Sequence, residues 1–165
     1  MNAVARPHAG LVCEAMSAAT RGPAERLLGR FLAADVHYRA SAAQYGDGGA
    51  QALADALDLF LARPELGFVW LAALDGAVVG ACVVCYAIST SRGGLVAKLD
   101  DVTVDDRMQG QGIGGAMLDA LVREMRDKGA RRIDTACHRG NGGAWRFYEA
   151  HGFRPLDEER ITCLL

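Results

Sequence analysis

The sequence predicts an α+β domain built on a mixed, mostly antiparallel central sheet. Two early segments carry apolar residues at helical spacing. Two apolar runs follow, joined by Asp75-Gly76, a dipeptide that favours a two-residue hairpin turn between antiparallel strands. Segments of strand, helix and strand character complete the chain. Because the 165 residues show no repeat, low-complexity tract or linker, we treat residues 1–165 as a single domain.

One strand and two helices are expected before the hairpin. Pro23 stands near the start of the first helical pattern, where proline is well tolerated. A polar, glycine-rich break at Gln44–Gly49 separates the two helical patterns, and the second ends before Pro64. The expected elements are a strand at Leu11–Met16 and amphipathic helices at Ala24–Val36 and Ala50–Leu61.

From the hairpin onward, strands and helices alternate. Lys98, Asp100 and Asp101 interrupt an otherwise apolar strand, an unusual place for carboxylates. Pro155 and the charged run Asp157-Glu158-Glu159 break the last strand region. About four helices are therefore expected to flank the sheet. The expected elements are strands at Phe68–Leu74, Ala77–Ile88 and Leu95–Val104, a helix from Gly112 to a stop at Gly129, a strand at Arg131–Cys137, a helix at Gly143–Ala150 and a terminal strand region at Phe153–Leu165.

Composition excludes several functional classes. With 51% hydrophobic and 23% charged residues, the chain has the composition of a globular protein rather than a disordered or fibrous one. The net charge of −2 argues against a nucleic-acid partner, because such proteins usually carry a basic excess. The longest uncharged stretch, Gly76–Ser91, is too short to span a membrane, and Met1–Gly10 lacks the apolar core of a signal peptide. We therefore expect a cytoplasmic protein without a membrane partner.

The cysteines and histidines do not predict a metal site. The five cysteines are an odd number, spread widely and mostly set in apolar runs, which is typical of reduced thiols rather than of a disulfide framework. Cys82 and Cys85 have the spacing of half a zinc site, but residues three apart on a strand point to opposite faces, and no second pair is present. The four histidines show no ligand spacing, so we assign no metal.

A glycine-rich turn after the strand at Leu95–Val104 predicts an anion site. Successive backbone N–H groups at the start of the following helix can bind a phosphate, and the helix dipole favours negative charge there. A P-loop is excluded because no Gly-Lys-Ser/Thr follows the glycines. The pattern Gly110-x-Gly112-x-x-Gly115 matches a dinucleotide fingerprint formally, but too little chain follows for that fold, and Asp134 lies early in its strand.

The same turn resembles the acetyl-CoA-binding signature of the GNAT acetyltransferase superfamily. Gln109-x-x-Gly112-x-Gly114 matches the family pattern Arg/Gln-x-x-Gly-x-Gly/Ala. Downstream, Asn141, the tripeptide Phe147-Tyr148-Glu149 and the dipeptide Gly152-Phe153 resemble the family's closing pattern. The resemblance covers Leu95–Pro155 and implies a GNAT fold and an acetyl-CoA cosubstrate.

The resemblance also implies roles for individual residues. The strand before the turn would hold the pantetheine arm, and the turn itself the pyrophosphate. Asn141 matches a cofactor-contacting residue, although a helix N-cap would also explain it. Tyr148 matches the residue that protonates the departing CoA thiolate, although an aromatic core position would explain it too. The implied acetyl-CoA contacts are Val102, Thr103, Val104, Gln109, Gly110, Gln111, Gly112, Ile113, Gly114, Gly115 and Asn141.

Attack by an amine needs a group that removes a proton, because alkyl amines are protonated at neutral pH. Leu99-Asp100-Asp101 resembles acidic pairs of polyamine-type members of the family, which favours Asp100 as the base. The short aspartate side chain favours proton transfer through a water molecule. Since adjacent strand residues face opposite ways, at most one carboxylate faces the substrate directly, and an ion pair with Lys98 is the alternative role. A backbone N–H near Val102 would stabilise the oxyanion.

The expected activity is direct transfer of an acetyl group from acetyl-CoA to a primary amine of a small molecule or peptide, without a covalent enzyme intermediate. A non-catalytic CoA-binding sensor would use the same turn without needing Tyr148, and a dinucleotide-binding module is the other alternative. The resemblance further implies a homodimer. The segment that builds the acceptor pocket in this family is rich in acidic and aromatic residues, which suits a cationic amine; these residues are Asp35, His37, Tyr38, Tyr45 and Asp47.

Overall fold

The computed structural model describes residues 8–164, so most of the expectation about Met1–Gly10 falls outside the described residues. Within them, five strands form one sheet in the order β1-β2-β3-β4-β5. Neighbours from β1 to β4 are antiparallel, whereas β4 and β5 are parallel. The predicted α+β class with a mixed, mostly antiparallel sheet is therefore confirmed. The strands are β1 (Leu11–Ala15), β2 (Gly67–Leu74), β3 (Ala77–Ser89), β4 (Gly94–Val104) and β5 (Ile133–Thr135).

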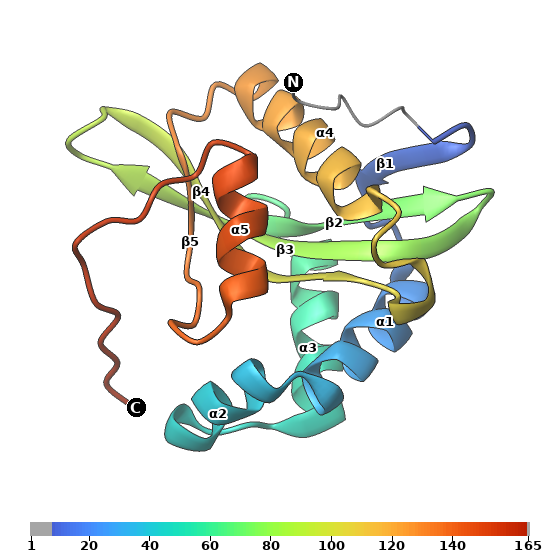
Figure 1. The fold of residues 1–165 in the computed structure, drawn as a ribbon, viewed down its shortest axis with the longest axis horizontal. Helices are drawn as coiled ribbons and strands as arrows, with labels where there is room; N and C mark the ends of the chain where they lie inside the picture. Colours follow the sequence, from blue (N-terminus) through green and yellow to red (C-terminus); the bar gives the residue numbers. More distant parts are fainter. Residues whose placement is uncertain (1–7, 165) are drawn as a thin grey trace.

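Helices cover both faces of the sheet, as Figure 1 shows. On one face, α4 and α5 pack against inward-facing side chains such as Trp70 and Leu99. On the other face, α1 and α3 pack against Val69 and Leu71. These residues flank Trp70 on β2, and successive strand residues point to opposite faces. The sheet is thus buried on both sides. The helices are α1 (Arg21–Ala34), α2 (Val36–Tyr45), α3 (Gly49–Ala62), α4 (Ile113–Asp127) and α5 (Gly142–Ala150), with a short 3-10 helix η1 (Asp106–Met108).

The hairpin between β2 and β3 forms where the sequence predicts it. Asp75 and Gly76 have φ angles of 49° and 82°, so both turn residues lie in the left-handed region. Two consecutive left-handed residues are the signature of the type I′ turn, whose twist matches that of the strands it joins. The turn dipeptide therefore determines this part of the register locally.

Helix α2 is an element that the apolar pattern does not reveal. The expected first helix ran to Val36, but α1 ends at Ala34, and Asp35 takes an extended conformation at the corner. The Asp35 carboxylate then accepts a hydrogen bond of 2.7 Å from the Tyr38 backbone N–H and caps α2. Only Ala42 of α2 is buried, so the helix has no apolar stripe that periodicity could detect. Residues 8–164 therefore contain five α-helices instead of about four.

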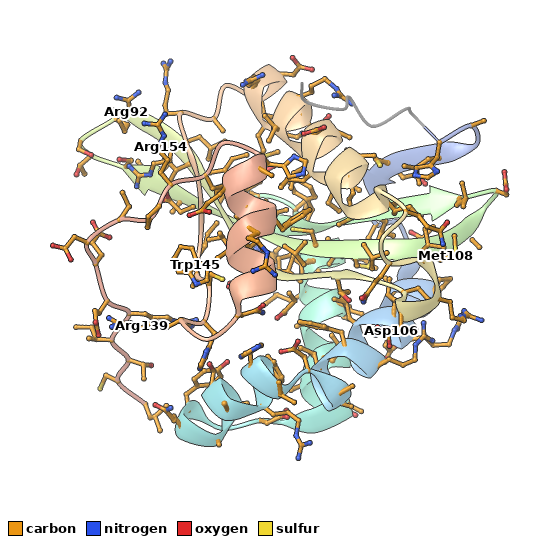
Figure 2. The ribbon with its side chains drawn as sticks, in the orientation of Figure 1. Arg92, Asp106, Met108, Arg139, Trp145 and Arg154 are labelled. Atoms are coloured by element: carbon orange, nitrogen blue, oxygen red, sulfur yellow. The ribbon has the colours of Figure 1, made fainter. Side chains whose placement is uncertain are left out.

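The terminal strand expected at Phe153–Leu165 is wrong over its described part, residues 153–164, which contain no strand. Pro155 cannot donate a ladder hydrogen bond, and Ile161 is 92% exposed instead of packing on the core. The segment is tied to the loop before α5 by an ion pair between Glu159 and Arg139, whose side chain points toward it in Figure 2. No helix in residues 8–164 is long and apolar enough to cross a membrane.

Candidate active site

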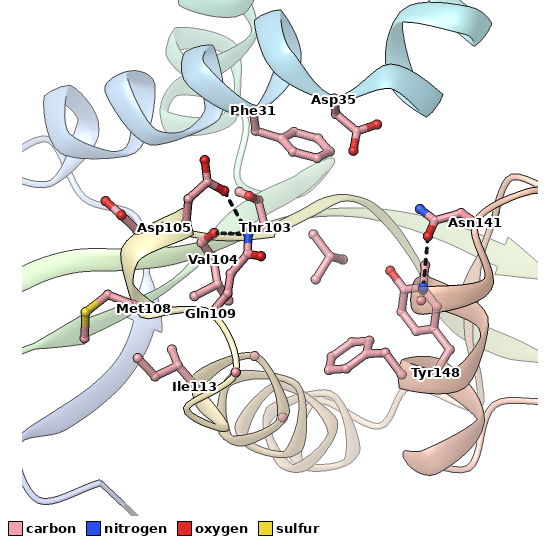
Figure 3. A pocket seen from close by; sticks show the side chains of 18 of the residues that line it. Phe31, Asp35, Thr103, Val104, Asp105, Met108, Gln109, Ile113, Asn141 and Tyr148 are labelled. Atoms are coloured by element: carbon pink, nitrogen blue, oxygen red, sulfur yellow. Dashed lines mark hydrogen bonds between the residues drawn. The ribbon is translucent and has the colours of Figure 1, made fainter.

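A groove of about 1950 Å³ opens beside the end of β4, between the end of α1, the first turn of α4 and α5. Figure 3 shows Phe31 and Asp35 on one side of it and Asn141 and Tyr148 on another. The sequence-predicted residues that line the groove are Val102, Thr103, Val104, Gln109, Gly110, Gly112, Ile113, Gly114, Gly115, Asn141 and Tyr148.

A β-bulge in β4 positions one wall of the groove. Ala81 pairs with Thr103 and Val83 with Asp100, so Asp101 and the residue after it lie opposite a single residue of β3. Asp101 has a φ of 52°, a left-handed conformation that is uncommon outside glycine, asparagine and aspartate. Parallel pairing with β5 ends at Leu99, immediately before the bulge. Pairing between β4 and β5 therefore stops short of the bulge, and β5 ends at Thr135, before the predicted end at Cys137.

The strand edge beyond the bulge is open toward the groove. Among the described residues, β5 pairs with only three residues of β4, Ala97, Lys98 and Leu99, and none of Val102–Val104 pairs with it. All three residues of Val102–Val104 line the groove. An extended ligand can add to such an edge by backbone hydrogen bonds, as a further strand would.

Two polar side chains brace the turn that follows β4. The Asp105 carboxylate accepts hydrogen bonds from the Arg107 guanidinium at 2.9 and 3.0 Å and from Arg30 of α1 at 3.2 Å. These bonds, chiefly those from Arg107, lower the pKa of Asp105 to about 2. Gln109 donates hydrogen bonds to the Val104 carbonyl at 3.1 Å and to Asp106 at 2.9 Å. The Gln109 amide therefore holds the turn itself.

Sequence reasoning missed the contribution of Asp105 and Arg30. The local signal for the first was the Asp-x-Arg spacing directly after the strand. The contact with Arg30 joins residues 75 positions apart and leaves no local signal. Gln111, a predicted contact, lies outside the groove wall, and its side-chain amide donates to the Arg107 carbonyl at 3.3 Å.

The first turn of α4 presents free backbone donors to the groove. Gly112 stands at the N-cap in a left-handed conformation, with a φ of 82°, and no side chain caps the helix. The first intrahelical hydrogen bond runs from the Ala116 N–H to the Gly112 carbonyl, which leaves the N–H groups of Ile113–Gly115 without helical partners. Three free donors at the positive end of the helix dipole form a site for a phosphate group.

Asn141 caps a helix and Tyr148 packs in the core, and both residues also line the groove. The Asn141 side-chain oxygen accepts a hydrogen bond of 3.0 Å from the Ala144 N–H and so caps α5, while the residue also lines the groove. Tyr148 is 9% exposed, and its ring packs against Phe147 and Phe153 at centroid distances of 5.3 Å. Burial raises the pKa of Tyr148 to about 12, so the phenol keeps its proton at neutral pH.

The structure distinguishes the two candidate carboxylates. Asp100 forms an ion pair of 2.9 Å with Lys98, the alternative role considered above. Burial, with the Asp100 charge as a smaller cause, raises the pKa of Asp101 to about 6. Neither side chain lies in the groove wall. A carboxylate with a raised pKa, as at Asp101, is often found at functional sites.

Thiol and imidazole groups do not assemble into a metal centre within residues 8–164, where no three potential ligands converge. All five cysteines are free thiols. Cys82 is buried and Cys85 is partly exposed.

Comparison with known proteins agrees with this geometry. The model of the acetyltransferase (GNAT) family matches residues 34–153, which is more than half of the chain. A possible acetyltransferase from Clostridium difficile 630 superposes with a TM-score of 0.78 at 13% identity, covering 94% of this chain and 97% of its own. A predicted acetyltransferase from Clostridium acetobutylicum, solved with acetyl-CoA, gives 0.70 at 16% identity and coverages of 93% and 96%.

A ribosomal-protein-alanine N-acetyltransferase from Brucella melitensis biovar Abortus 2308 has a TM-score of 0.68 at 17% identity, with coverages of 94% and 99%. At these identities the structural likeness shows the fold alone, while the family model matches the groove residues from Ala34 onward but not Arg30 and Phe31. The chain therefore belongs to the acetyltransferase (GNAT) family.

Proposed function

We propose that this protein transfers an acetyl group from acetyl-CoA directly to a primary amine of a small molecule or peptide. One observation carries the proposal. A single groove collects the free donors of the α4 N-terminus, the open edge of β4 and the Tyr148 side chain. Family membership supports acyl transfer from a CoA thioester.

Each part of the donor has a matching part of the groove. The N–H groups of Ile113–Gly115 suit the pyrophosphate, because they combine free donors with the positive end of the helix dipole. The edge of Val102–Val104 suits the pantetheine arm, whose amides can form strand-like hydrogen bonds. This arrangement directs the thioester toward Tyr148.

The reaction requires one bond to form and one to break. The amine nitrogen attacks the acetyl carbon, the carbon–sulfur bond breaks, and the thiolate accepts a proton. Tyr148 is suited to supply that proton, because burial keeps its hydroxyl protonated at neutral pH. A backbone N–H of β4 near Val102 would stabilise the oxyanion of the tetrahedral intermediate.

Asp101 is our choice for the base that takes the proton of the amine. A carboxylate with a pKa of about 6 accepts a proton more readily than an ordinary aspartate, and it is still ionised at pH 7.5. Asp100 is engaged by Lys98 instead. Since Asp101 stands outside the groove wall, proton transfer through a water molecule fits its position better than direct contact.

The acceptor is, in this proposal, a cationic amine. Asp35 and Phe31 line the end of the groove formed by α1 and face the side that holds Tyr148 (Figure 3). Burial, followed by the nearby carboxylates of Asp47 and Asp101, raises the pKa of Tyr38. Carboxylates and aromatic rings together favour an ammonium group.

Thermal unfolding with acetyl-CoA, CoA and NAD added separately tests the donor. Ligand at a hundred times its dissociation constant stabilises the folded protein by about 2.7 kcal/mol. We expect stabilisation by both CoA ligands and none by NAD. Stabilisation by NAD alone would indicate a dinucleotide-binding module instead.

Release of free CoA thiol in the presence of primary amines tests the reaction. We expect turnover with amines that carry a second positive charge, and a higher KM for them in Asp35→Asn. Binding of acetyl-CoA without turnover on any amine would indicate a CoA sensor and refute the proposed transfer.

A further inference from the structure

His151 lies where α5 ends against the first turn of α4. Its Nδ1 is 3.0 Å from a carboxylate oxygen of Asp119, and its ring packs on Phe147 at a centroid distance of 5.0 Å. A Cβ placed on Gly115 would lie 3.0 Å from Cε1 and 3.1 Å from Nε2 of the ring. The Nε2 edge of His151 is therefore adjacent to the turn of α4 that carries the free N–H groups.

The glycine at position 115 leaves the space that this ring occupies. Contacts of 3.0 and 3.1 Å are tighter than ordinary van der Waals contact, so a side chain there would displace His151. The His151 side chain keeps 20% exposure, and both Gly115 and His151 line the groove. The ring is thus held in one orientation and remains accessible to a ligand.

The groove has few positive charges for a ligand that is negative. Two of its lining side chains can carry a positive charge, Arg30 and His151, and Arg30 already binds Asp105 at 3.2 Å. Gln109, which holds the turn before α4, is neutral. The carboxylates that line the groove are Asp35, Asp105, Asp106, Asp119 and Glu149.

We propose that His151 binds the pyrophosphate of the CoA donor through Nε2–H, with Asp119 orienting the ring through Nδ1–H. This inference rests on the proposed function. Both ring nitrogens donate only in the imidazolium, which then lies between two anions, the Asp119 carboxylate and the phosphate. His151 also follows the last residue of α5, and the negative end of a helix dipole favours a cation. Asp119 on α4 and Glu149 on α5 are the carboxylates of the groove wall on the two helices that His151 joins.

If His151 binds the pyrophosphate, its replacement should weaken binding only of ligands that carry a pyrophosphate. We would measure the dissociation constants of CoA by calorimetry and of pantetheine, which lacks the pyrophosphate, by competition with CoA. His151→Gln should weaken CoA binding at least about tenfold, the lower end of the range for a lost hydrogen bond to a charged group, and leave pantetheine binding unchanged. Asp119→Asn keeps the His151 ring, so it should also weaken CoA binding, but less than His151→Gln does.

Matched controls separate binding from folding. His138→Gln removes a histidine outside the groove wall and should alter neither constant. Thermal unfolding without ligand shows whether each variant folds. If His151→Gln does not fold, the CoA affinity of Asp119→Asn tests the proposal instead. Equal CoA affinity in the variant and the unaltered protein, or an equal loss for pantetheine, would overturn the role of His151 alone. Absence of CoA binding by the unaltered protein would instead refute the proposed function.

Discussion

Replacing Asp101 by asparagine should stabilise the protein while it impairs catalysis. The pKa of Asp101 rises from 3.8 to about 6, chiefly because the carboxylate is partly buried, so folding disfavours its charged form. At about 1.4 kcal/mol per pKa unit, this difference corresponds to about 3 kcal/mol of lost stability at pH 7.5. Asparagine has no charge and also tolerates the left-handed φ of 52°, so the substitution changes the charge without adding backbone strain.

The stability gained by Asp101→Asn should depend on pH, because only the charged form of Asp101 is disfavoured by folding. A carboxyl group with a raised pKa contributes stability that is fully present below 3.8, its ordinary value, and is lost as the pH rises through about 6. The gain in the free energy of unfolding of Asp101→Asn should therefore fall from about 3 kcal/mol at pH 7.5 to about 1 kcal/mol at pH 4.5. Urea unfolding followed by circular dichroism at the two pH values measures it.

Asp100→Asn is the matched control. Its carboxylate forms a partly exposed ion pair with Lys98, worth about 0–1 kcal/mol, and its charge is only a smaller cause of the raised pKa of Asp101, so this variant should gain much less stability than Asp101→Asn. Acetyl transfer at pH 7.5 should fall at least about 100-fold in Asp101→Asn, the usual range for a lost general base. An Asp101→Asn variant no more stable than the unaltered protein at pH 7.5, or equally stabilised at both pH values, would refute the reasoning.

Three further substitutions test the groove. Tyr148→Phe should lower the rate of acetyl transfer about 100-fold and leave the CoA dissociation constant unchanged, because it removes the proton donor alone. A CoA affinity that falls as much as the rate would contradict this role. Gly112→Ala should lower the free energy of unfolding by about 1–2 kcal/mol, measured with urea, since its φ of 82° strains any residue with a Cβ; an unchanged value would argue against that strain. Asp105→Asn should destabilise the protein above pH 4, because the lowered pKa of Asp105 gives stability that is lost only as the pH falls through about 2. An unchanged free energy of unfolding in urea at pH 7 would show that the Asp105 carboxylate does not stabilise the turn.

Features encoded by neighbouring residues could be predicted from the sequence. Asp75-Gly76 specified the hairpin because both residues accept positive φ. The glycine pattern around Gly112 specified a turn that opens a helix with free N–H groups, and the structure has this turn. The alternating apolar runs specified the strands, since each element carries its own periodicity.

The unpredicted features have little or no local signal. Helix α2 lacks an apolar stripe, because it buries only Ala42, and its start depends on the cap supplied by Asp35. The segment after Phe153 contains β-forming residues, yet its described part pairs with no strand. A strand needs a partner in space, and composition cannot supply one.

The sequence by itself determined the class of fold, the anion-binding turn and the identity of the candidate site residues. The tertiary structure alone decided the surroundings and partners of Asp100, Asp101 and His151. Asp101 lies partly buried in the bulge while Lys98 engages Asp100, although the two aspartates are adjacent in the chain. His151 meets Asp119 across 32 positions. Charge states and ion pairs depend on burial and on distances in space, and these exist only once the helices have packed on the sheet.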